Sequence, residues 1–354
     1  MIHQYKNNGY NIVMDVNSGS IHVVDDMSYD IIAMYEESAK EEIVEKLGTQ
    51  YPAEEIAEAW DEITELKDAG KLFTEDVYEK YIDGFADRPT VVKALCLHIA
   101  HDCNLACRYC FAEEGEYHGR RAMMSYEVGK KALDFLIANS GKRKNLEVDF
   151  FGGEPLMNWQ VVKDLVAYGR SQEEIHNKKF RFTLTTNGVL LNDEVMEFAN
   201  KEMSNVVLSL DGRKEVHDKY RVDYAGKGSW EQIVPKFQKF VAARGGKNYY
   251  MRGTFTHANP DFLNDIKTML DLGFTELSME PVVCPPDDPC ALTDEDLPKL
   301  FEQYEILAKE MIKQLTPCTG CRYCTEYCPM GLDIPVLLDL YNEGYACAAK
   351  IEFL

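Results

Sequence analysis

Six apolar segments alternate with amphipathic helical segments between residues 94 and 281, and this order restricts the fold more than any other feature. The expected strands lie at residues 94–100, 146–151, 180–186, 205–210, 249–256 and 275–281. The expected helices lie at residues 125–139, 159–172, 192–202, 230–243, 260–271 and 297–313. A repeated strand-then-helix order produces a parallel sheet, so the sequence predicts an α/β fold. Six units are fewer than the eight of a closed barrel.

Three cysteines follow the first expected strand with the spacing C-x3-C-x2-C: Cys103, Cys107 and Cys110. Barrels of parallel strands keep their functional residues on loops at this end of the sheet. Thiolates are soft ligands that suit iron–sulfur clusters, and three of them leave one iron of a 4Fe–4S cluster open to a substrate. A zinc knuckle is one alternative, because His101 or His118 could provide a fourth ligand. Three unrelated core cysteines are another.

Glycine-rich and polar segments follow the next three strands. Gly152 and Gly153 would let a ligand approach the backbone closely, and Glu154 offers a carboxylate to an ammonium group. Asn187 and Ser209 end the third and fourth strands, where polar side chains point toward the barrel mouth. Each segment alone could be an ordinary turn, because Asn-Gly and Asp-Gly favour turns for local reasons. Their common position at strand ends favours a binding site.

The region from about residue 90 to 285 resembles radical S-adenosylmethionine (SAM) peptide maturases, through the cysteine motif and the Gly152-Gly-Glu-Pro segment. It looks most similar to the thioether-forming maturase of the Cys-rich SCIFF peptides. The resemblance implies a partial (β/α)6 TIM-like barrel with a catalytic 4Fe–4S cluster on the three cysteines. It also implies a set of SAM-binding residues: Tyr109, Gly152, Gly153, Glu154, Asn187, Ser209 and Arg221. Within it, Arg221 suits the methionine carboxylate through its planar guanidinium.

Residues 1–80 are expected to form a separate module. Residues 10–25 predict two strands around the turn Asn17-Ser-Gly19, and helices are expected at 28–38, 40–47 and 53–69. This winged-helix-like module resembles the peptide-recognition elements of maturases of ribosomally made peptides. Such elements bind a leader peptide as an added strand. A structural cap without a ligand is the alternative. The barrel is then expected over 90–312 and an iron–sulfur segment over 313–354.

The C-terminal segment departs from the SCIFF-type maturases, whose SPASM domain carries more widely spread cysteines. Its C-x2-C-x2-C-x3-C-P run is typical of bacterial ferredoxins and resembles the tail of certain aldo/keto-reductase-family proteins. The run predicts one auxiliary 4Fe–4S cluster on Cys318, Cys321, Cys324 and Cys328. The fourth ligand stays open, since it could instead be Cys347, Cys284 or Cys290, whereas Cys96 is expected in the core.

Composition argues against a nucleic-acid partner and against insertion into a membrane. The chain of 354 residues has a net charge of −22, which disfavours binding to nucleic-acid phosphates. No apolar stretch approaches the roughly 20 residues of a membrane helix, and no signal segment is evident, so we expect a cytoplasmic protein. The 11 cysteines in such a chain favour metal ligation in a reducing compartment over disulfides.

The expected function is that of a radical SAM oxidoreductase. By resemblance, it cleaves SAM reductively and joins cysteine sulfurs to α-carbons in a Cys-rich precursor peptide with a leader, using a reductant such as ferredoxin or flavodoxin. One alternative is an anaerobic sulfatase-maturase-like oxidation of a Cys or Ser on a protein. Another is a non-catalytic iron–sulfur electron carrier or scaffold, which would not bind SAM.

Overall fold

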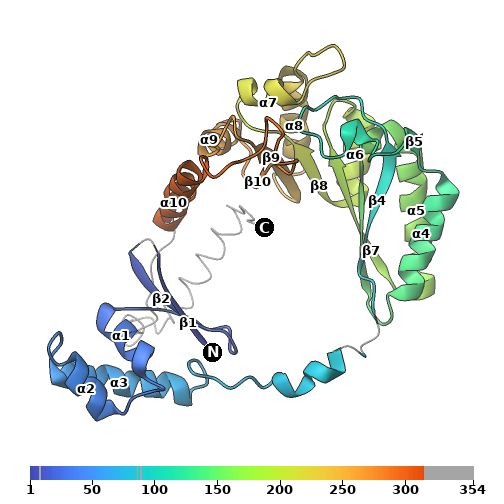
Figure 1. The fold of residues 1–354 in the computed structure, drawn as a ribbon. Coiled ribbons are helices and arrows are strands. Elements are labelled where there is room, and N and C mark those ends of the chain that lie inside the picture. The colour runs from blue at the N-terminus through green and yellow to red at the C-terminus, as the bar shows by residue number, and fades with distance from the viewer. Residues whose placement is uncertain (8, 86, 88–89, 315–354) are drawn as a thin grey trace, which may run out of the picture. The chain divides into compact units, whose positions relative to one another are not determined.

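The computed structural model describes residues 1–314, apart from residues 8, 86 and 88–89 (Figure 1). The chain divides into two compact units, Met1–Pro89 and Thr90–Leu354. No helix in the described part of the chain has both the length and the apolar character needed to cross a membrane. The cysteines expected to hold the auxiliary cluster lie outside the described residues: Cys318, Cys321, Cys324 and Cys328, with Cys347.

The first unit is a three-stranded antiparallel sheet with three α-helices. Its strands pair in the order β1-β2-β3: β1 (Ile2–Asn7), β2 (Tyr10–Asp15) and β3 (Ile21–Val24). The helices are α1 (Asp26–Met34), α2 (Lys40–Leu47) and α3 (Ala53–Asp68), followed by the 3-10 helix η1 (Glu79–Phe85). The sequence predicted β2, β3 and the three helices but missed β1. Its polar residues gave no strand signal, although it pairs with β2 along its whole length.

The sheet and the three α-helices of this unit bury apolar side chains in a common core. Ile56, Ala59 and Ile63 follow the helical period along one face of α3 and are buried. Asp15 is also buried, at the end of β2, where its carboxylate accepts hydrogen bonds from the backbone and hydroxyl of Thr74. These bonds fix the segment that follows α3 to the sheet.

The second unit contains a seven-stranded sheet in the order β10-β9-β8-β7-β6-β4-β5. Its strands are β4 (Ala94–His101), β5 (Ala122–Met123), β6 (Asn145–Gly152), β7 (Lys179–Thr186), β8 (Met203–Ser209), β9 (Tyr249–Phe255) and β10 (Leu277–Pro281). All pairs are parallel except β4 with the two-residue β5. The predicted parallel α/β order is therefore confirmed, and the six predicted strands agree with the observed ones to within two residues.

Helices cover the convex side of this sheet (Figure 1). They are α4 (Tyr126–Asn139), α5 (Trp159–His176), α6 (Asp193–Glu202), α7 (Lys214–Tyr220), α8 (Trp230–Ala243), α9 (Leu263–Asp271) and α10 (Leu297–Gln314). The sequence predicted all of them except α7. Short 3-10 helices, η2 (Glu113–Gly115) and η3 (Pro155–Asn158), follow β4 and β6.

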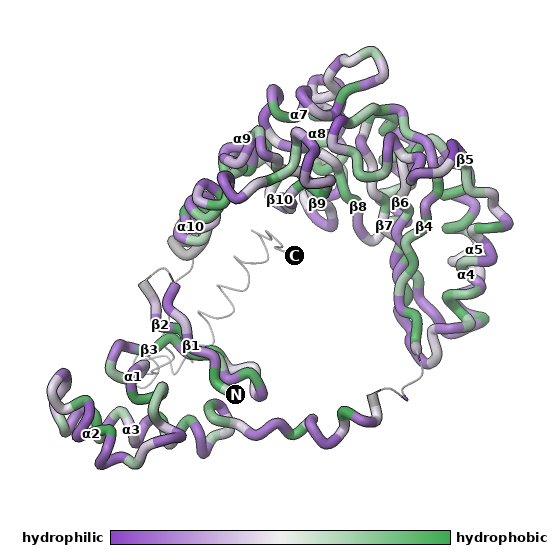
Figure 2. Tube along the Cα trace, viewed as in Figure 1, coloured by the Kyte–Doolittle hydropathy of each residue, from purple (hydrophilic) through white to green (hydrophobic). Residues whose placement is uncertain are grey.

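Side chains alternate between the two faces of each strand. Figure 2 shows that hydrophobic and hydrophilic residues both occur along the strands of this sheet. Phe150, Phe182 and Leu208 point to the helix-covered face and are fully buried. The opposite, concave face is more polar. One row of register partners crosses four neighbouring strands there: Cys96 on β4, Asp149 on β6, Thr183 on β7 and Asn205 on β8. We call these four residues the polar row.

Candidate active site

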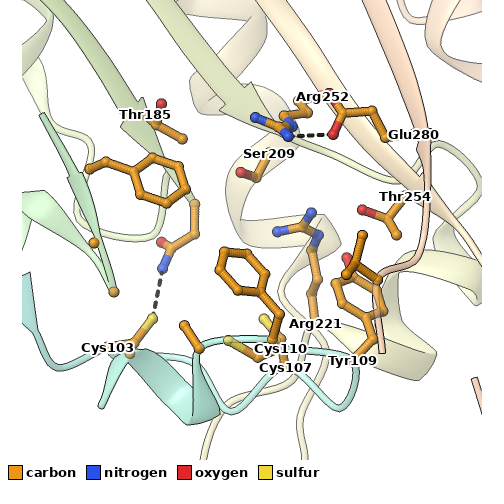
Figure 3. A pocket seen from close by; sticks show the side chains of 18 of the residues that line it. Cys103, Cys107, Tyr109, Cys110, Thr185, Ser209, Arg221, Arg252, Thr254 and Glu280 are labelled. Carbon is orange, nitrogen blue, oxygen red and sulfur yellow. Dashed lines mark hydrogen bonds and ion pairs between the residues drawn. The ribbon is translucent and has the colours of Figure 1, made fainter. Parts of the chain in front are cut away.

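A cavity of about 250 Å³ lies at the carboxyl ends of the strands (Figure 3). Nine of the residues predicted to hold the cofactors line it: Cys103, Cys107, Tyr109, Cys110, Gly152, Gly153, Asn187, Ser209 and Arg221. They come from the carboxyl ends of β6, β7 and β8, from the loop after β4 and from the end of α7. The fold therefore brings together residues that are up to 118 positions apart in the chain (221 − 103).

The loop that carries the three cysteines is fixed by backbone hydrogen bonds. The N–H of Cys103 donates to the Asp102 carboxylate at 2.9 Å, and the N–H of Arg108 donates to the Tyr220 carbonyl at 3.0 Å. Burial raises the pKa of the Cys103 and Cys107 thiols to about 12. Thiols in such surroundings stay protonated unless a metal centre takes the proton's place.

The donor set fits an iron–sulfur cluster better than a zinc ion. Within the described ranges, no three His, Cys, Asp or Glu side chains are grouped so that they could hold a single metal ion. A tetrahedral zinc needs ligands that converge on one point, whereas a 4Fe–4S cluster takes each thiolate on a separate iron. His118, one of the two histidines considered for zinc, is exposed and contacts Glu113 instead.

The paired glycines allow the end of β6 to lie directly against the start of the cysteine loop. A Cβ at Gly153 would lie 2.1 Å from the carbonyl oxygen of Asp102, and one at Gly152 would lie 2.5 Å from that of Ala100. Gly152 also has φ 118°, which favours glycine. Both positions therefore require glycine, and they set the place of Cys103 relative to β6.

Glu154 differs from the other predicted site residues, because its side chain does not line the cavity. It is fully buried and accepts three hydrogen bonds, from Leu156 N, Thr186 Oγ1 and Asn187 N, at 3.0, 2.8 and 2.8 Å. Burial raises its pKa to about 7. The carboxylate thus ties the end of β6 to the end of β7. Its predicted contact with an ammonium group stays a prediction.

Asn187 is oriented by the cysteine loop. Its Nδ2 atom donates to Asn104 Oδ1 at 2.8 Å and lies 3.6 Å from the sulfur of Cys103 (Figure 3). The amide therefore joins the end of β7 to the first cysteine.

Asp211 connects three elements around the cavity. Its carboxylate accepts hydrogen bonds from the Tyr109 hydroxyl at 2.6 Å, from Arg221 Nε at 3.0 Å and from Thr254 N at 3.0 Å. Asp211 is fully buried and Arg221 nearly so, which makes this a buried ion pair and not a surface one. The Arg221 guanidinium also lies 5.5 Å from the centre of the Tyr109 ring and points into the cavity (Figure 3).

A buried histidine contacts the backbone of Asp211. His217 Nδ1 accepts a hydrogen bond from Asp211 N at 3.3 Å, and Nε2 lies 2.9 Å from Ser229 Oγ. Burial lowers the pKa of His217 to about 4, so the ring is neutral at pH 7. The backbone of Asp211 is therefore held by an uncharged partner.

The sequence pattern of the radical SAM superfamily matches residues 97–277, about half of the chain. The chain belongs to this superfamily. Radical SAM enzymes use a 4Fe–4S cluster and SAM, and the cavity with its three thiols lies inside the matched region.

Several characterised enzymes are similar to parts of this radical SAM chain. It is 25% identical over 190 residues to the radical SAM cyclopropyl synthase TigE of Paramaledivibacter caminithermalis, covering 49% of this chain and 38% of that enzyme. It is 31% identical over 137 residues to the cysteine-type anaerobic sulfatase-maturating enzyme of Clostridium novyi, covering 38% of this chain and 36% of that enzyme. The chain thus matches less than half the length of these relatives.

A solved structure supports the fold assignment. The structure of anSMEcpe with bound AdoMet and Kp18Cys peptide superposes with a TM-score of 0.54 at 20% identity, covering 62% of this chain and 61% of that one. At this identity the likeness concerns the fold of the radical SAM unit.

Sequence reasoning missed an ion pair at this radical SAM site. Arg252 on β9 and Glu280 on β10 form a salt bridge on the cavity wall (Figure 3). Charged residues at alternate positions of apolar parallel strands were the available signal. The role of Asp211 has no signal of its own in the sequence, because Asp-Gly after a strand is also typical of an ordinary turn.

Proposed function

We propose that this radical SAM enzyme is an oxidoreductase that modifies a Cys-rich ribosomal precursor peptide, forming thioether bonds between cysteine sulfurs and α-carbons. The observation that carries the proposal is that three thiols and the polar strand ends line one and the same cavity. Its position in the family-matched region supports the use of SAM. The likeness to maturing enzymes supports a peptide or protein substrate.

The residues around the cavity suit the expected cofactors. Cys103, Cys107 and Cys110 would hold the cluster, and Arg221 would hold a carboxylate with the part of its guanidinium that Asp211 does not engage. Gly152, Gly153, Asn187, Ser209 and Tyr109 would complete the SAM site, with Glu154 as a further predicted contact. When bound, the cluster and SAM supply the means to take a hydrogen atom from an unreactive carbon.

Thioether formation requires a defined balance of protons and electrons. One hydrogen atom leaves the acceptor α-carbon, one proton leaves the cysteine thiol, and one electron must pass to an acceptor. We propose that Cys318, Cys321, Cys324 and Cys328 hold an auxiliary 4Fe–4S cluster that takes this electron. A ferredoxin or flavodoxin would supply the electron that starts each turnover.

The decisive test is anaerobic reconstitution beside a Cys103→Ala, Cys107→Ala, Cys110→Ala triple variant. We expect SAM cleavage to 5′-deoxyadenosine with wild type and its loss in the variant, whose iron content falls by about one 4Fe–4S cluster. Wild type should then give crosslinked peptide two hydrogens lighter than the substrate. Iron binding without any SAM cleavage would instead favour the electron carrier or scaffold.

We also propose that residues 1–80 bind the leader of the peptide. In the three-stranded sheet β3 is an edge strand, and its Ile21 and Val23 side chains are 61% and 63% exposed. An exposed apolar edge is a template for an added strand, whose main chain pairs with the edge while its side chains pack on the exposed ones.

Charge on this edge is expected to weaken leader binding. The double substitution Ile21→Lys, Val23→Lys removes apolar contact area and places two cations where an added strand would pack, so the leader dissociation constant should rise about tenfold or more. Fluorescence anisotropy with a labelled leader measures it. The matched control is Ile175→Lys on α5, where the side chain is 70% exposed. Equal affinities for all three proteins would contradict a leader site at β3.

A second candidate is a sulfatase-maturase-like activity, supported by the 31% identity to the Clostridium novyi enzyme. The two candidates differ in product. Sulfatase-type oxidation converts a single Cys or Ser to an aldehyde, which a hydrazide probe captures, whereas a thioether consumes a thiol and leaves no aldehyde. Mass spectrometry of a Cys-containing sulfatase peptide and of a Cys-rich precursor, treated in parallel, separates them.

A further inference from the structure

A second cavity, of about 290 Å³, lies on the concave face of the sheet and is lined by all four residues of the polar row. In it, the side-chain oxygen Asn205 Oδ1 is buried and has no hydrogen-bond partner within the described residues. A buried acceptor without a protein donor is satisfied by a water or by a ligand with N–H, O–H or S–H groups, so this cavity can receive a polar group.

Asp149 lies between this cavity and the cavity lined by the three cysteines, which we call the SAM cavity. Its side chain lines the second cavity, and the hydroxyl of Thr185, which lines the SAM cavity, approaches its Oδ1 at 3.5 Å. A substrate reaching from the concave face toward SAM would therefore pass Asp149.

The other carboxylates near the two cavities already have strong partners. Asp211 pairs with Arg221, and Glu280 pairs with Arg252. Glu147, in the second cavity, contacts Lys93 and Arg181, and Glu154 accepts three hydrogen bonds behind the cavity wall. Among the described residues Asp149 forms no ion pair, and the hydrogen bond that its side chain accepts is the long one from Thr185 to Oδ1. Its carboxylate can therefore accept a proton from a substrate.

The surroundings of Asp149 make it a stronger base than an exposed carboxylate. Burial raises its pKa to about 6, against smaller opposing effects of Thr185 and Arg252. Cys96 from β4 faces it in the polar row, with Arg181 from β7 and Glu147 from β6 in the same cavity. A base whose pKa lies just below neutral pH is ionised and suited to general-base catalysis.

We propose that Asp149 accepts the proton of the substrate cysteine thiol, an inference that rests on the proposed thioether-forming function. The S–H bond breaks, its proton passes to Oδ1 or Oδ2 of Asp149, and the electron pair stays on sulfur as a thiolate. That sulfur then bonds to the acceptor α-carbon, whose C–H bond has been broken by loss of its hydrogen atom to the SAM-derived radical, and the one surplus electron would pass to the proposed auxiliary cluster. The carboxylic acid returns its proton to solvent through the second cavity.

The test compares Asp149→Asn with wild type and with Asp164→Asn, the same change at an exposed position of α5. Asp149→Asn should cleave SAM without peptide at the wild-type rate and retain its iron. The ratio of crosslinked peptide to 5′-deoxyadenosine should fall about 100-fold, the size of a typical general-base effect. Asp164→Asn should match wild type in both readouts.

A peptide with selenocysteine in place of the reacting cysteine separates proton transfer from binding. Its selenol is ionised at neutral pH and needs no base, so it should restore the product ratio of Asp149→Asn. An unchanged ratio with the cysteine peptide, or no recovery with selenocysteine, would overturn the proposal while the proposed function stands. Wild type that cleaves SAM but never crosslinks a peptide overturns the thioether function and the role of Asp149 with it.

Discussion

Asp211→Ala is expected to lower the stability of the radical SAM unit by about 3–5 kcal/mol, because it leaves the buried Arg221 guanidinium without its counter-charge. The same change removes the acceptor for the Tyr109 hydroxyl and for Thr254 N. For a unit of this size the midpoint of thermal unfolding should fall by roughly 10 °C. SAM cleavage should also fall sharply, since Tyr109 and Arg221 both line the cavity.

Calorimetry of the reconstituted protein under anaerobic conditions measures the stability effect. Asp211→Asn keeps an oxygen acceptor while losing the charge, so it should lie between wild type and Asp211→Ala. Glu194→Ala is the matched control, because Glu194 also pairs with a cation, Lys163, but is mostly exposed. Exposed pairs contribute little. If the Asp211→Ala protein is as stable as the Glu194→Ala control, the buried Asp211–Arg221 ion pair does not stabilise the radical SAM unit.

Gly153→Ala should abolish cluster binding at the three cysteines. The added methyl group would lie 2.1 Å from the backbone oxygen of Asp102. This overlap is relieved only if the backbone of Asp102, the residue before Cys103, moves. Overlap with rigid backbone is costly, so the cysteine loop rather than the methyl must shift. We expect iron content to fall and 5′-deoxyadenosine formation to drop at least about 100-fold.

Gly84→Ala is the control for this substitution, because a Cβ at Gly84 meets nothing within 4 Å. It should retain wild-type iron and activity. Absorbance near 400 nm and an iron assay follow the cluster. Normal cluster content in Gly153→Ala would show that the loop tolerates displacement and that the close approach of β6 is not needed.

The architecture of the radical SAM unit could be predicted from the sequence because its strands are continuous apolar runs between amphipathic helices. Elements without that signal were missed. β1 is polar, β5 has only two residues, and α7 lies in the charged segment before Arg221. Each is defined by tertiary pairing or packing, which local propensity does not report.

The site was predictable where spacing and residue type carry the chemistry, as for the three cysteines. The partners that orient the site were not predictable. Asp211 follows β8 and contacts Thr254 on β9, while Arg252 on β9 contacts Glu280 on β10. The two residues of each pair are far apart in sequence, and only the pairing of neighbouring strands brings them together. Glu154 is predicted to contact a ligand, but its side chain is buried outside the cavity lining, and this burial depends on how closely β6 and β7 end beside one another.

The alternation along the strands also bears on how such a protein can diverge. Phe150 and Phe182 pack into the helix-covered core. The residues that alternate with them along the same strands, such as Asp149 and Thr183, face the concave side. Substitutions on the concave side leave the packing of the core largely intact, so selection can alter substrate preference at small cost in foldability. Descendants of one ancestral sheet can thus acquire different substrates while the helix-facing half of each strand changes slowly.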